Sequence, residues 1–292
     1  MPVVRIEPMN GVIGATVRDI DLAQELRSVA IADVVAELTD TLDRHLVVVM
    51  PEQRLSPGEQ TELTHHFGSA CPTPFVKTMD EFPEVIKVLK EADEANAFNF
   101  GGAWHSDFSF MERPPSYTLL HAIDVPAFGG DTVWTNNIAA LDQLLPPFRD
   151  AIDAVGAMGV HTAKDAYSPK MQSIHDGLKH MDIRTTEDAN ELQTHPVITT
   201  HPGNGRETLF FNQAYVRDLE GVEVPDGDVD AFMRGLHHHS TSHQFTVRHR
   251  WRNGDLAIWD NRATQHLALN DYGGFRRELH RTTVQGGAPT RR

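Results

Sequence analysis

The chain has 292 residues, of which 40% are hydrophobic, which is enough to bury a full core in one large domain. Its 41 acidic residues outnumber its 26 lysines and arginines, and the formal net charge of −15 argues against nucleic acid and membrane surfaces as partners. Cys71 is the only cysteine, which excludes an internal disulfide and a thiolate-rich metal site and is typical of a cytoplasmic protein. No signal peptide or membrane span is recognisable, so we expect a soluble cytoplasmic protein. No repeat or linker divides the chain, so we predict a single domain over residues 1–292.

The first third of the chain predicts short strands and two helices. Hydrophobic runs predict strands over residues 3–6 and 46–50, and a helical hydrophobic period predicts a helix over residues 26–42, with Val29 among its apolar positions. A second helix is expected from Ser56, where Glu59 completes a capping box, to Gly68.

A strand over residues 85–89 leads to a segment, 91–102, that is rich in Asn, Ala and Gly. We predict that this segment is a mobile loop beside the active site.

The remaining sequence alternates short strands with a few helices. Segments rich in β-branched and aromatic residues predict strands over 117–123, 132–134, 197–200, 207–211, 244–247, 255–259 and 279–284, and helical patterns predict helices over 138–145, 148–155 and 229–238. Many short strands, with helices mostly in the first part, predict a mainly β fold with helical decoration around an antiparallel jelly-roll barrel.

A candidate metal site begins with His105 and Asp107, which are two residues apart. On an extended strand, side chains two residues apart point to the same face, so both can bind one cation. His266, which follows a predicted strand and a turn, is the candidate third ligand. Two histidines and a carboxylate on one face of an octahedron leave the opposite positions open, an arrangement typical of non-haem Fe(II) oxygenases.

Two arginines follow His266 along the chain. Arg277 and Arg281 are four residues apart on a predicted strand, so we expect both guanidinium groups to project into one pocket. Arginine holds carboxylates with two parallel hydrogen bonds, which makes the pair a local trap for an anion. Arg281 also has a purely structural alternative, an ion pair with an acidic residue of the barrel.

Several motifs occur in order over nearly the whole chain. They are Trp104-His105-Ser106-Asp107, Gly129-Gly130-Asp131-Thr132-Val133-Trp134, Phe211-Asn212-Gln213, Trp259-Asp260-Asn261-Arg262, Gln265-His266 and the pair Arg277 and Arg281. In this order and spacing they resemble the taurine/phenoxyalkanoate dioxygenase family.

The resemblance implies a cupin-like double-stranded β-helix core in which His105, Asp107 and His266 bind Fe(II). 2-Oxoglutarate would be the co-substrate, with its distal carboxylate held by Arg277 and the hydroxyl of Thr132, and O2 would be the oxidant. It also implies that Arg281 contacts the acidic group of a small organic substrate. Hydroxylation of that substrate beside a heteroatom would then cleave it.

Departures from the taurine-cleaving members of the family indicate a different substrate. Those members have a His and a Tyr where this chain reads Pro72-Thr73-Pro74-Phe75-Val76, and an Asn in place of Gly101. These differences predict a substrate pocket that is larger and more apolar than in the taurine-cleaving members, lined by Phe75, Val76, Phe100 and Gly101. We therefore expect a hydrophobic sulfonate, alkyl sulfate ester or phenoxyalkanoate as substrate, and a homo-oligomer, either a dimer or a tetramer.

Two other functions stay open from the residues alone. A Zn(II) hydrolase would use the same three ligands, but the sequence has no evident general base beside them. A non-catalytic barrel that binds an anion would need neither the complete triad nor Arg277, so the presence of all four residues argues against it.

Further histidines and tryptophans have plainer explanations. We expect the histidines outside the triad to be solvated: His65, His66, His175, His180, His237, His238, His239 and His243. Trp104 and Trp259 are expected to pack beside the metal-binding strands.

Overall fold

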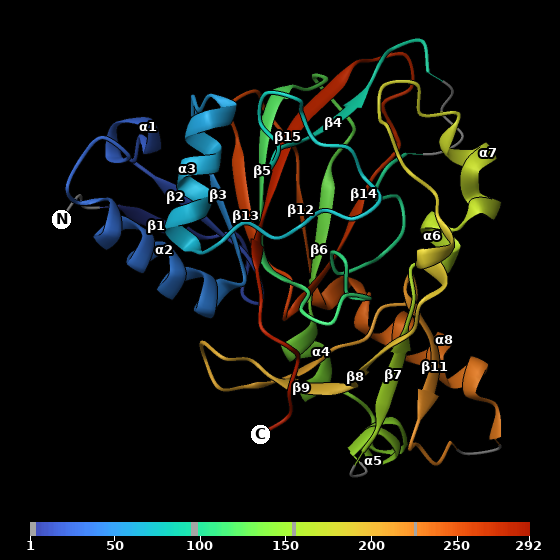
Figure 1. The fold of residues 1–292 in the computed structure, drawn as a ribbon. Helices are drawn as coiled ribbons and strands as arrows, with labels where there is room; N and C mark the ends of the chain where they lie inside the picture. Colours follow the sequence, from blue (N-terminus) through green and yellow to red (C-terminus); the bar gives the residue numbers. More distant parts are fainter. Residues whose placement is uncertain (1–3, 95–98, 154–155, 225–226) are drawn as a thin grey trace.

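The core of the protein consists of two β-sheets that pack face to face. This computed structural model describes residues 4–94, 99–153, 156–224 and 227–292 (Figure 1). The larger sheet contains, in spatial order, β1 (Arg5–Pro8), β2 (Ala15–Arg18), β3 (Val47–Met50), β13 (Leu256–Asp260), β5 (Pro115–Asp124), β15 (Arg277–Gln285) and β4 (Ile86–Lys90). The second sheet contains β12 (Thr246–His249), β6 (Thr132–Asn136) and β14 (Thr264–Ala268). The predicted jelly-roll with helical decoration is therefore confirmed.

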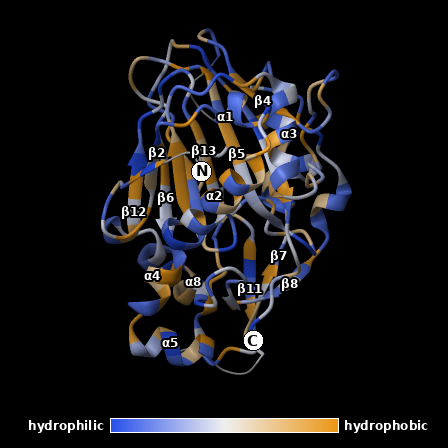
Figure 2. Ribbon diagram, turned by 90° about the vertical axis from the view of Figure 1, so that its left-hand side faces the viewer, coloured by the Kyte–Doolittle hydropathy of each residue, from blue (hydrophilic) through white to orange (hydrophobic). Residues whose placement is uncertain are grey.

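The strands of the larger sheet are hydrophobic on both faces because both faces are covered. Val47, Val49 and Trp259 face the second sheet and form a core with Trp134. Their neighbours in the chain point the other way, against helices α2 (Ile31–His45) and α3 (Pro57–Phe67). Figure 2 shows the hydrophobic colouring of these central strands. The alternation of two faces explains why residues 46–50 read as one continuous hydrophobic run.

Of the two helices that cover the outer face of the larger sheet, α3 has the predicted bounds and α2 does not. Helix α3 has the predicted capping box, in which Ser56 accepts from the backbone of Glu59 and the Glu59 carboxylate accepts in return, and its cap is Gly68. The helix predicted over residues 26–42 begins later than expected, because residues 26–30 form turns between α1 (Leu22–Glu25) and α2, which begins at Ile31. Val29 lies in the intervening turn and is fully exposed, so the prediction that it packs in the helix was wrong.

A second group of elements packs below the barrel in Figure 1. It contains a sheet ordered β11 (Val216–Glu220), β7 (Met158–His161) and β8 (Gln193–Pro196), and a hairpin of β9 (Ile198–Thr200) and β10 (Glu207–Leu209). Its helices are α4 (Asn137–Asp142), α5 (Pro146–Asp153) and α8 (Val229–Ser240). Their shared core includes Ile152, Phe211 and Leu236. The last two residues of the predicted helix 148–155 lie outside the described residues.

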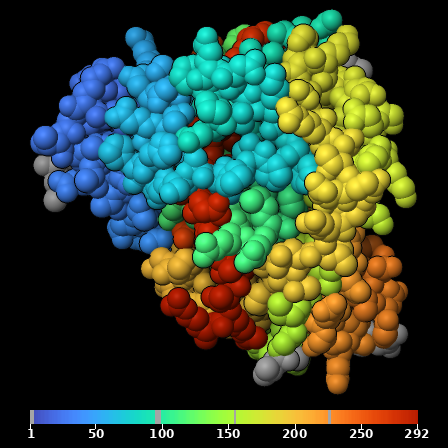
Figure 3. All heavy atoms as spheres, viewed as in Figure 1, coloured from blue at the N-terminus to red at the C-terminus, as the bar shows by residue number. Residues whose placement is uncertain are grey.

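The segment between β7 and β8 covers one end of the barrel. It contains α6 (Lys164–Tyr167), η1 (Pro169–Met171), α7 (Gln172–His175) and η2 (Glu187–Asn190). Elsewhere in the chain, the short 3-10 helix η4 (His243–Phe245) precedes β12. In Figure 3 this yellow segment packs against the cyan part of the chain. The cluster beneath it joins Tyr167 and Ile183 to Val76, Ile86 and Tyr215. No described helix is both long and apolar enough to cross a membrane.

Candidate metal and substrate site

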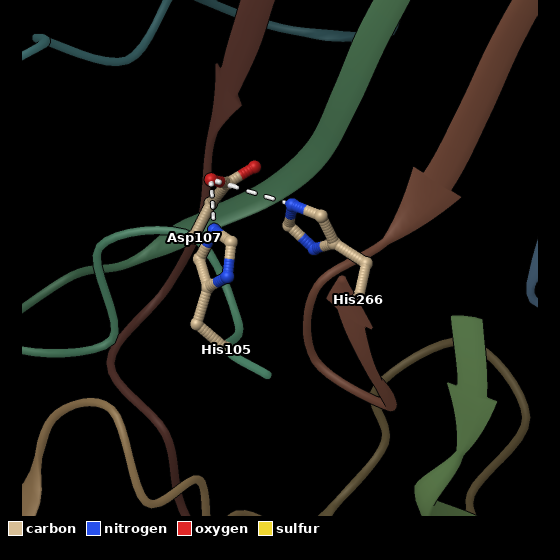
Figure 4. A group of neighbouring side chains, drawn as sticks. All are labelled: His105, Asp107 and His266. Carbon is tan, nitrogen blue, oxygen red and sulfur yellow. Dashed lines mark ion pairs between the residues drawn. The ribbon is translucent and has the colours of Figure 1, made fainter. Parts of the chain in front are cut away.

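The three candidate ligands lie together at the covered end of the barrel (Figure 4). The Nε2 atoms of His105 and His266 lie 3.6 Å and 4.0 Å from Oδ1 of Asp107. All three side chains are buried, and one ligand atom from each lies within 4.8 Å of the others. The predicted ligands therefore meet at one point, although His266 follows the other two by about 160 positions in the sequence.

The local backbone around His105 is not the strand that the sequence predicted. His105 and His266 form a single antiparallel bridge, with reciprocal backbone hydrogen bonds of 3.1 and 2.8 Å, and His266 lies on β14. The chain then enters a turn in which Phe108 has a φ of 46°. Asp107 therefore reaches the imidazoles from a turn, which a two-residue spacing alone does not distinguish from a strand.

The protonation states of the triad suit a divalent cation. Burial by itself raises the pKa of Asp107, but the Arg281 guanidinium and the two imidazoles outweigh it and hold that pKa well below its ordinary value. Burial and the neighbouring His105 lower the pKa of His266 well below its ordinary value. Nδ1 of His105 lies 2.7 Å from the Ala103 carbonyl, which assigns the proton to Nδ1 and leaves Nε2 as a ligand. The residues thus fit an Fe(II) ion bound by two neutral imidazoles and one carboxylate.

A cavity of about 240 Å³ opens beside the triad. Arg281, His105 and Asp107 line its inner end. Most of its wall is apolar, formed by Phe100, Ala103, Ala166, Met171 and Ala214. Asp165 and Arg217 also line the cavity and pair with each other at 2.6 Å.

Two of the four predicted substrate-pocket residues line this cavity and two do not. Phe100 and Gly101 contribute to its wall. Phe75 and Val76 are absent from the lining; the ring of Phe75 stacks on that of Tyr167, which lines the cavity, at 5.0 Å, and both Phe75 and Val76 belong to the hydrophobic cluster of Tyr167. The sequence prediction was wrong for Phe75 and Val76, which support the wall from behind.

The sequence reasoning missed two tyrosines that line the cavity. Tyr167 and Tyr215 are both buried, and a hydrogen bond joins their side chains. Tyr167 lies in α6, and Tyr215 immediately precedes β11, where Asn212 holds its backbone. Asn212, part of the motif Phe211-Asn212-Gln213, was the one available signal for this region.

Arg281 makes the ion pair that the sequence left open as an alternative, and part of its guanidinium stays unpaired among the described residues. Its Nη1 atom donates to Oδ1 of Asp107 at 3.0 Å, so the ion pair with an acidic residue exists. Its Nε and Nη2 atoms are buried without a hydrogen-bond partner among the described residues. These two N–H groups lie on one edge of the guanidinium, which is the edge that binds an oxyanion with two hydrogen bonds.

Arg277 and Arg281 do not share a pocket, contrary to the prediction. Arg277 donates from Nε to the Gly130 carbonyl at 3.0 Å and lies near the ring of Tyr272. It lines a second, small cavity, and Phe100 lines both that cavity and the one beside Arg281. The pairing of β15 with β4 is regular from Arg277 to Arg281, so the two side chains lie four residues apart along one strand, and each lines its own cavity.

Thr132 lies close to Arg277 in the fold, because it follows Gly130 by two residues at the start of β6. Its hydroxyl accepts a hydrogen bond of 3.0 Å from Nε1 of Trp251. The hydroxyl proton is therefore available for a second partner.

The other histidines mostly do not enter the site. His65, His180 and His238 are exposed, and the first two lie beside acidic residues, as expected of solvated side chains. His175 is different: it is buried, lines the cavity and stacks on Tyr167, so the prediction of a solvated imidazole was wrong there. Trp259 packs against the ring of His266 at 4.7 Å, as predicted.

A second cluster of His and acidic residues has a structural explanation. Asp43, His201 and Asp260 lie close together. Both ring nitrogens of His201 are occupied, since Nε2 lies 2.9 Å from Asp260 and Nδ1 accepts from the backbone of Gly203 and Asn204. The imidazole therefore has no lone pair left for a metal.

Comparison with known proteins identifies the family. Residues 5–283 match the family model described as taurine catabolism dioxygenase TauD, TfdA family. The chain belongs to this family. The TauD/TfdA assignment confirms the predicted enzyme class: the chain is a 2-oxoglutarate-dependent non-haem iron dioxygenase, and Fe(II), 2-oxoglutarate and O2 are its cofactors and co-substrates.

Relatives of this TauD/TfdA protein differ in the substrates that their names give. An alpha-ketoglutarate-dependent sulfate ester dioxygenase from Pseudomonas putida is 33% identical over 97% of this chain and 90% of its own length. An alpha-ketoglutarate-dependent 2,4-dichlorophenoxyacetate dioxygenase from Cupriavidus pinatubonensis is 30% identical over 95% of this chain and 96% of its own. A solved taurine dioxygenase from Burkholderia xenovorans has a TM-score of 0.78 and 30% identity, over 99% of this chain and 93% of that one.

Proposed function

We propose that His105, Asp107 and His266 bind the Fe(II) ion of this TauD/TfdA dioxygenase. The observation that carries the proposal is the convergence of two imidazole nitrogens and one carboxylate oxygen at a buried point beside a cavity. Three protein ligands on one face leave room for a chelating keto acid and for O2. When bound, Fe(II) and 2-oxoglutarate supply the oxidising chemistry.

The protein's contribution on the co-substrate side is to bind a dicarboxylate in a fixed orientation. Arg277 would hold the distal carboxylate, since among the described residues only its Nε has a protein acceptor. Burial lowers the pKa of Arg277, so an anion beside the guanidinium would recover part of the cost of burying its charge. Thr132 would donate its free hydroxyl proton to the same carboxylate.

On the substrate side, the protein would bind an anion through the open edge of Arg281. The two unpartnered N–H groups are buried, and an unsatisfied buried donor costs about 1–3 kcal/mol, so a bound oxyanion is strongly favoured there. The apolar wall would hold a hydrophobic body and keep water away from the reacting carbon. The substrate class that fits is a hydrophobic sulfonate, alkyl sulfate ester or phenoxyalkanoate, which the reaction hydroxylates and thereby cleaves.

Among the described residues that line this cavity, both carboxylates, Asp107 and Asp165, already have partners, so neither is free for an amine on the substrate. The carboxylate of Asp107 is occupied by its hydrogen bonds and the proposed metal, and Asp165 pairs with Arg217. Taurine, which carries an ammonium group, is therefore a poor fit. We expect the alkyl or aryl anions to be preferred.

Succinate release tests the reaction and its substrate class together. The enzyme with Fe(II) and 2-oxoglutarate would be screened with alkyl sulfates, alkanesulfonates and phenoxyacetates of matched size, with taurine as the comparison. We expect a hydrophobic member to stimulate succinate formation and taurine to leave it near the background. Stimulation by taurine alone would refute the proposed substrate class.

A separate measurement tests the metal ligands and excludes the hydrolase alternative. Without O2, addition of 2-oxoglutarate to the Fe(II) protein should give a weak visible charge-transfer band. The band should be absent with Zn(II) and in His105→Ala. Absence of the band from the wild type under all conditions would contradict the proposed iron site and would favour a hydrolase or a carrier.

The organisation of the whole protein stays a prediction. We infer that residues 1–292 act as one domain, in the cytoplasm, and as a dimer or tetramer. A cytoplasmic location is supported by the single buried Cys71, which forms no disulfide. Light scattering during size-exclusion chromatography measures the assembly state, and a monomer would contradict the prediction.

A further inference from the structure

Asp107 is held by a closed ring of hydrogen bonds that begins at its own backbone. Its backbone N–H donates to Oδ1 of Asn261 at 3.3 Å. Nδ2 of Asn261 donates to Oγ1 of Thr118 at 2.8 Å. The Thr118 hydroxyl donates in turn to Oδ2 of Asp107 at 2.7 Å. The ring therefore connects the backbone and the carboxylate of one residue through two other side chains.

The direction of every proton in this ring is fixed by chemistry. Oδ1 of Asn261 also accepts from Nε1 of Trp259 at 3.0 Å, so the oxygen of the amide must face these two donors and its nitrogen must face Thr118. Because the Thr118 oxygen accepts from the amide, its only proton is left for Oδ2 of Asp107. All four side chains are buried, so water does not compete for these bonds.

The same ring reaches a second candidate ligand. Trp259, which donates to Asn261, packs against the imidazole of His266. Thr118 lies directly opposite Trp259 on the neighbouring strands β5 and β13. Asn261 thus connects the positions of Asp107 and His266, although it does not contact His266 itself.

The two oxygens of Asp107 have different surroundings as a consequence. Oδ2 is occupied by the short hydrogen bond from Thr118, whereas Oδ1 is the oxygen nearest to both imidazole nitrogens. Arg281 also donates to Oδ1 and leaves Oδ2 to Thr118.

We propose that Thr118 and Asn261 are positioning residues that hold the Asp107 carboxylate with Oδ1 turned toward the proposed metal position. Without the Thr118 hydroxyl the carboxylate could rotate, and Oδ1 would no longer be held beside the two imidazole nitrogens. This inference rests on the proposed metal triad. It assigns a role to two residues that touch neither the ion nor the substrate.

Metal affinity of the intact protein tests the proposal without relying on turnover. The dissociation constant for Mn(II) would be measured by calorimetric titration in the wild type, Thr118→Val and Thr118→Ser. Valine keeps the shape of threonine but lacks the hydroxyl, and partners of metal ligands typically contribute about 10–100-fold to affinity. We expect Thr118→Val to weaken Mn(II) by about tenfold or more and Thr118→Ser, which keeps the hydroxyl, to retain most of the affinity.

A matched control separates this effect from general destabilisation. Thr64→Val removes another fully buried hydroxyl, which bonds to Gln60 and Thr282 and contacts no member of the triad. We expect it to leave Mn(II) affinity unchanged. Equal weakening by Thr64→Val and Thr118→Val, or unchanged affinity in Thr118→Val, would overturn the proposal.

A variant of Asn261 provides an independent arm if Thr118→Val does not fold. Asn261→Asp has the same shape but replaces the amide donor by an acceptor, so the Thr118 proton would turn away from Asp107. The added negative charge alone should tighten the binding of a cation. Weaker binding would therefore support the positioning role, and unchanged or tighter binding would refute it.

Failure of the metal triad itself has a different signature. His105→Ala should abolish Mn(II) binding at this site whatever the role of Thr118. If His105→Ala binds Mn(II) as the wild type does, the proposed ligands are wrong. If it loses binding while Thr118→Val does not, only the positioning role is refuted.

Discussion

Replacement of Arg281 by lysine tests whether the open edge of its guanidinium binds the substrate. Lysine keeps a positive charge beside Asp107 but lacks the two parallel donors of arginine. The guanidinium donates to Asp107 through Nη1 and leaves Nε and Nη2 for the substrate, so the variant should lose about one charge-assisted hydrogen bond to the anion. Such a bond contributes about 1.5–3 kcal/mol, which corresponds to roughly a 10- to 100-fold increase in the KM for the substrate.

The measurement compares two ligands in the same variant. Succinate release gives the KM of the organic anion, and anaerobic titration of the charge-transfer band gives the Kd of 2-oxoglutarate. In Arg281→Lys the KM of the organic anion should rise, whereas the Kd of 2-oxoglutarate should stay within about twofold. The reason is that Arg281 and Arg277 line different cavities, so a change at one should have little effect at the other. Arg277→Lys is the matched control and should give the opposite pattern. Equal effects of both variants on 2-oxoglutarate would refute the assignment of the two arginines.

Two further predictions concern buried side chains outside the reaction. Burial lowers the pKa of His161 from 6.5 to about 3, so the unfolded chain binds a proton between these values and the folded chain does not; stability should fall with falling pH, by about 2 kcal/mol from pH 7 to pH 5. Other buried histidines, such as His266, also cost stability as the pH falls, so urea unfolding of the metal-free protein should show a smaller loss in His161→Gln than in the wild type, and identical pH dependence of the two would contradict the idea. Burial also raises the pKa of the Cys71 thiol to about 11, so a thiol reagent at pH 8 should label Cys71 only after unfolding, and rapid labelling of the folded protein would count against the packing described.

The parts of the fold that the sequence predicted well are those with a local signal. The capping box of Ser56 and Glu59 needs only four consecutive residues, and it is present as expected. The strand predicted over residues 46–50 is β3 (Val47–Met50), and its residues are all hydrophobic because both of its faces are buried. In each case the residues that decide the structure are neighbours in the chain.

The strands that the sequence did not predict lack such a signal. Strand β7 contains Gly159, which a pattern based on side chains treats as a break. An added Cβ there would lie 3.2 Å from the imidazole of His161, which accounts for the missing side chain. Strand β14 begins with three polar residues, Thr264, Gln265 and His266, and all three are buried where the strand pairs with β6. Long-range packing decided these elements.

The substrate cavity shows the same limit of sequence reasoning. The motif residues predicted the metal triad and Arg281, but the wall depends on segments whose approach has no local pattern. Phe75 was expected at the surface of the cavity, yet Tyr167, from a segment about ninety positions further along, stacks over it. A spacing argument identifies which residues can bind a ligand, whereas the identity of the wall depends on which loop covers the barrel.

The separation of Arg277 from Arg281 has a consequence for how two anions bind in a protein with a net charge of −15. If both guanidinium groups faced one pocket, the first anion to bind would neutralise part of the attraction for the second. Arg281 and Arg277 line different cavities, which have Phe100 in common, so each anion would meet its own buried arginine under the proposed function. The remaining connection between the two ligands is Asp107, which contacts Arg281 directly and belongs to the proposed metal site to which 2-oxoglutarate would bind. Coupling between substrate and co-substrate should therefore depend on how firmly Thr118 and Asn261 hold that carboxylate.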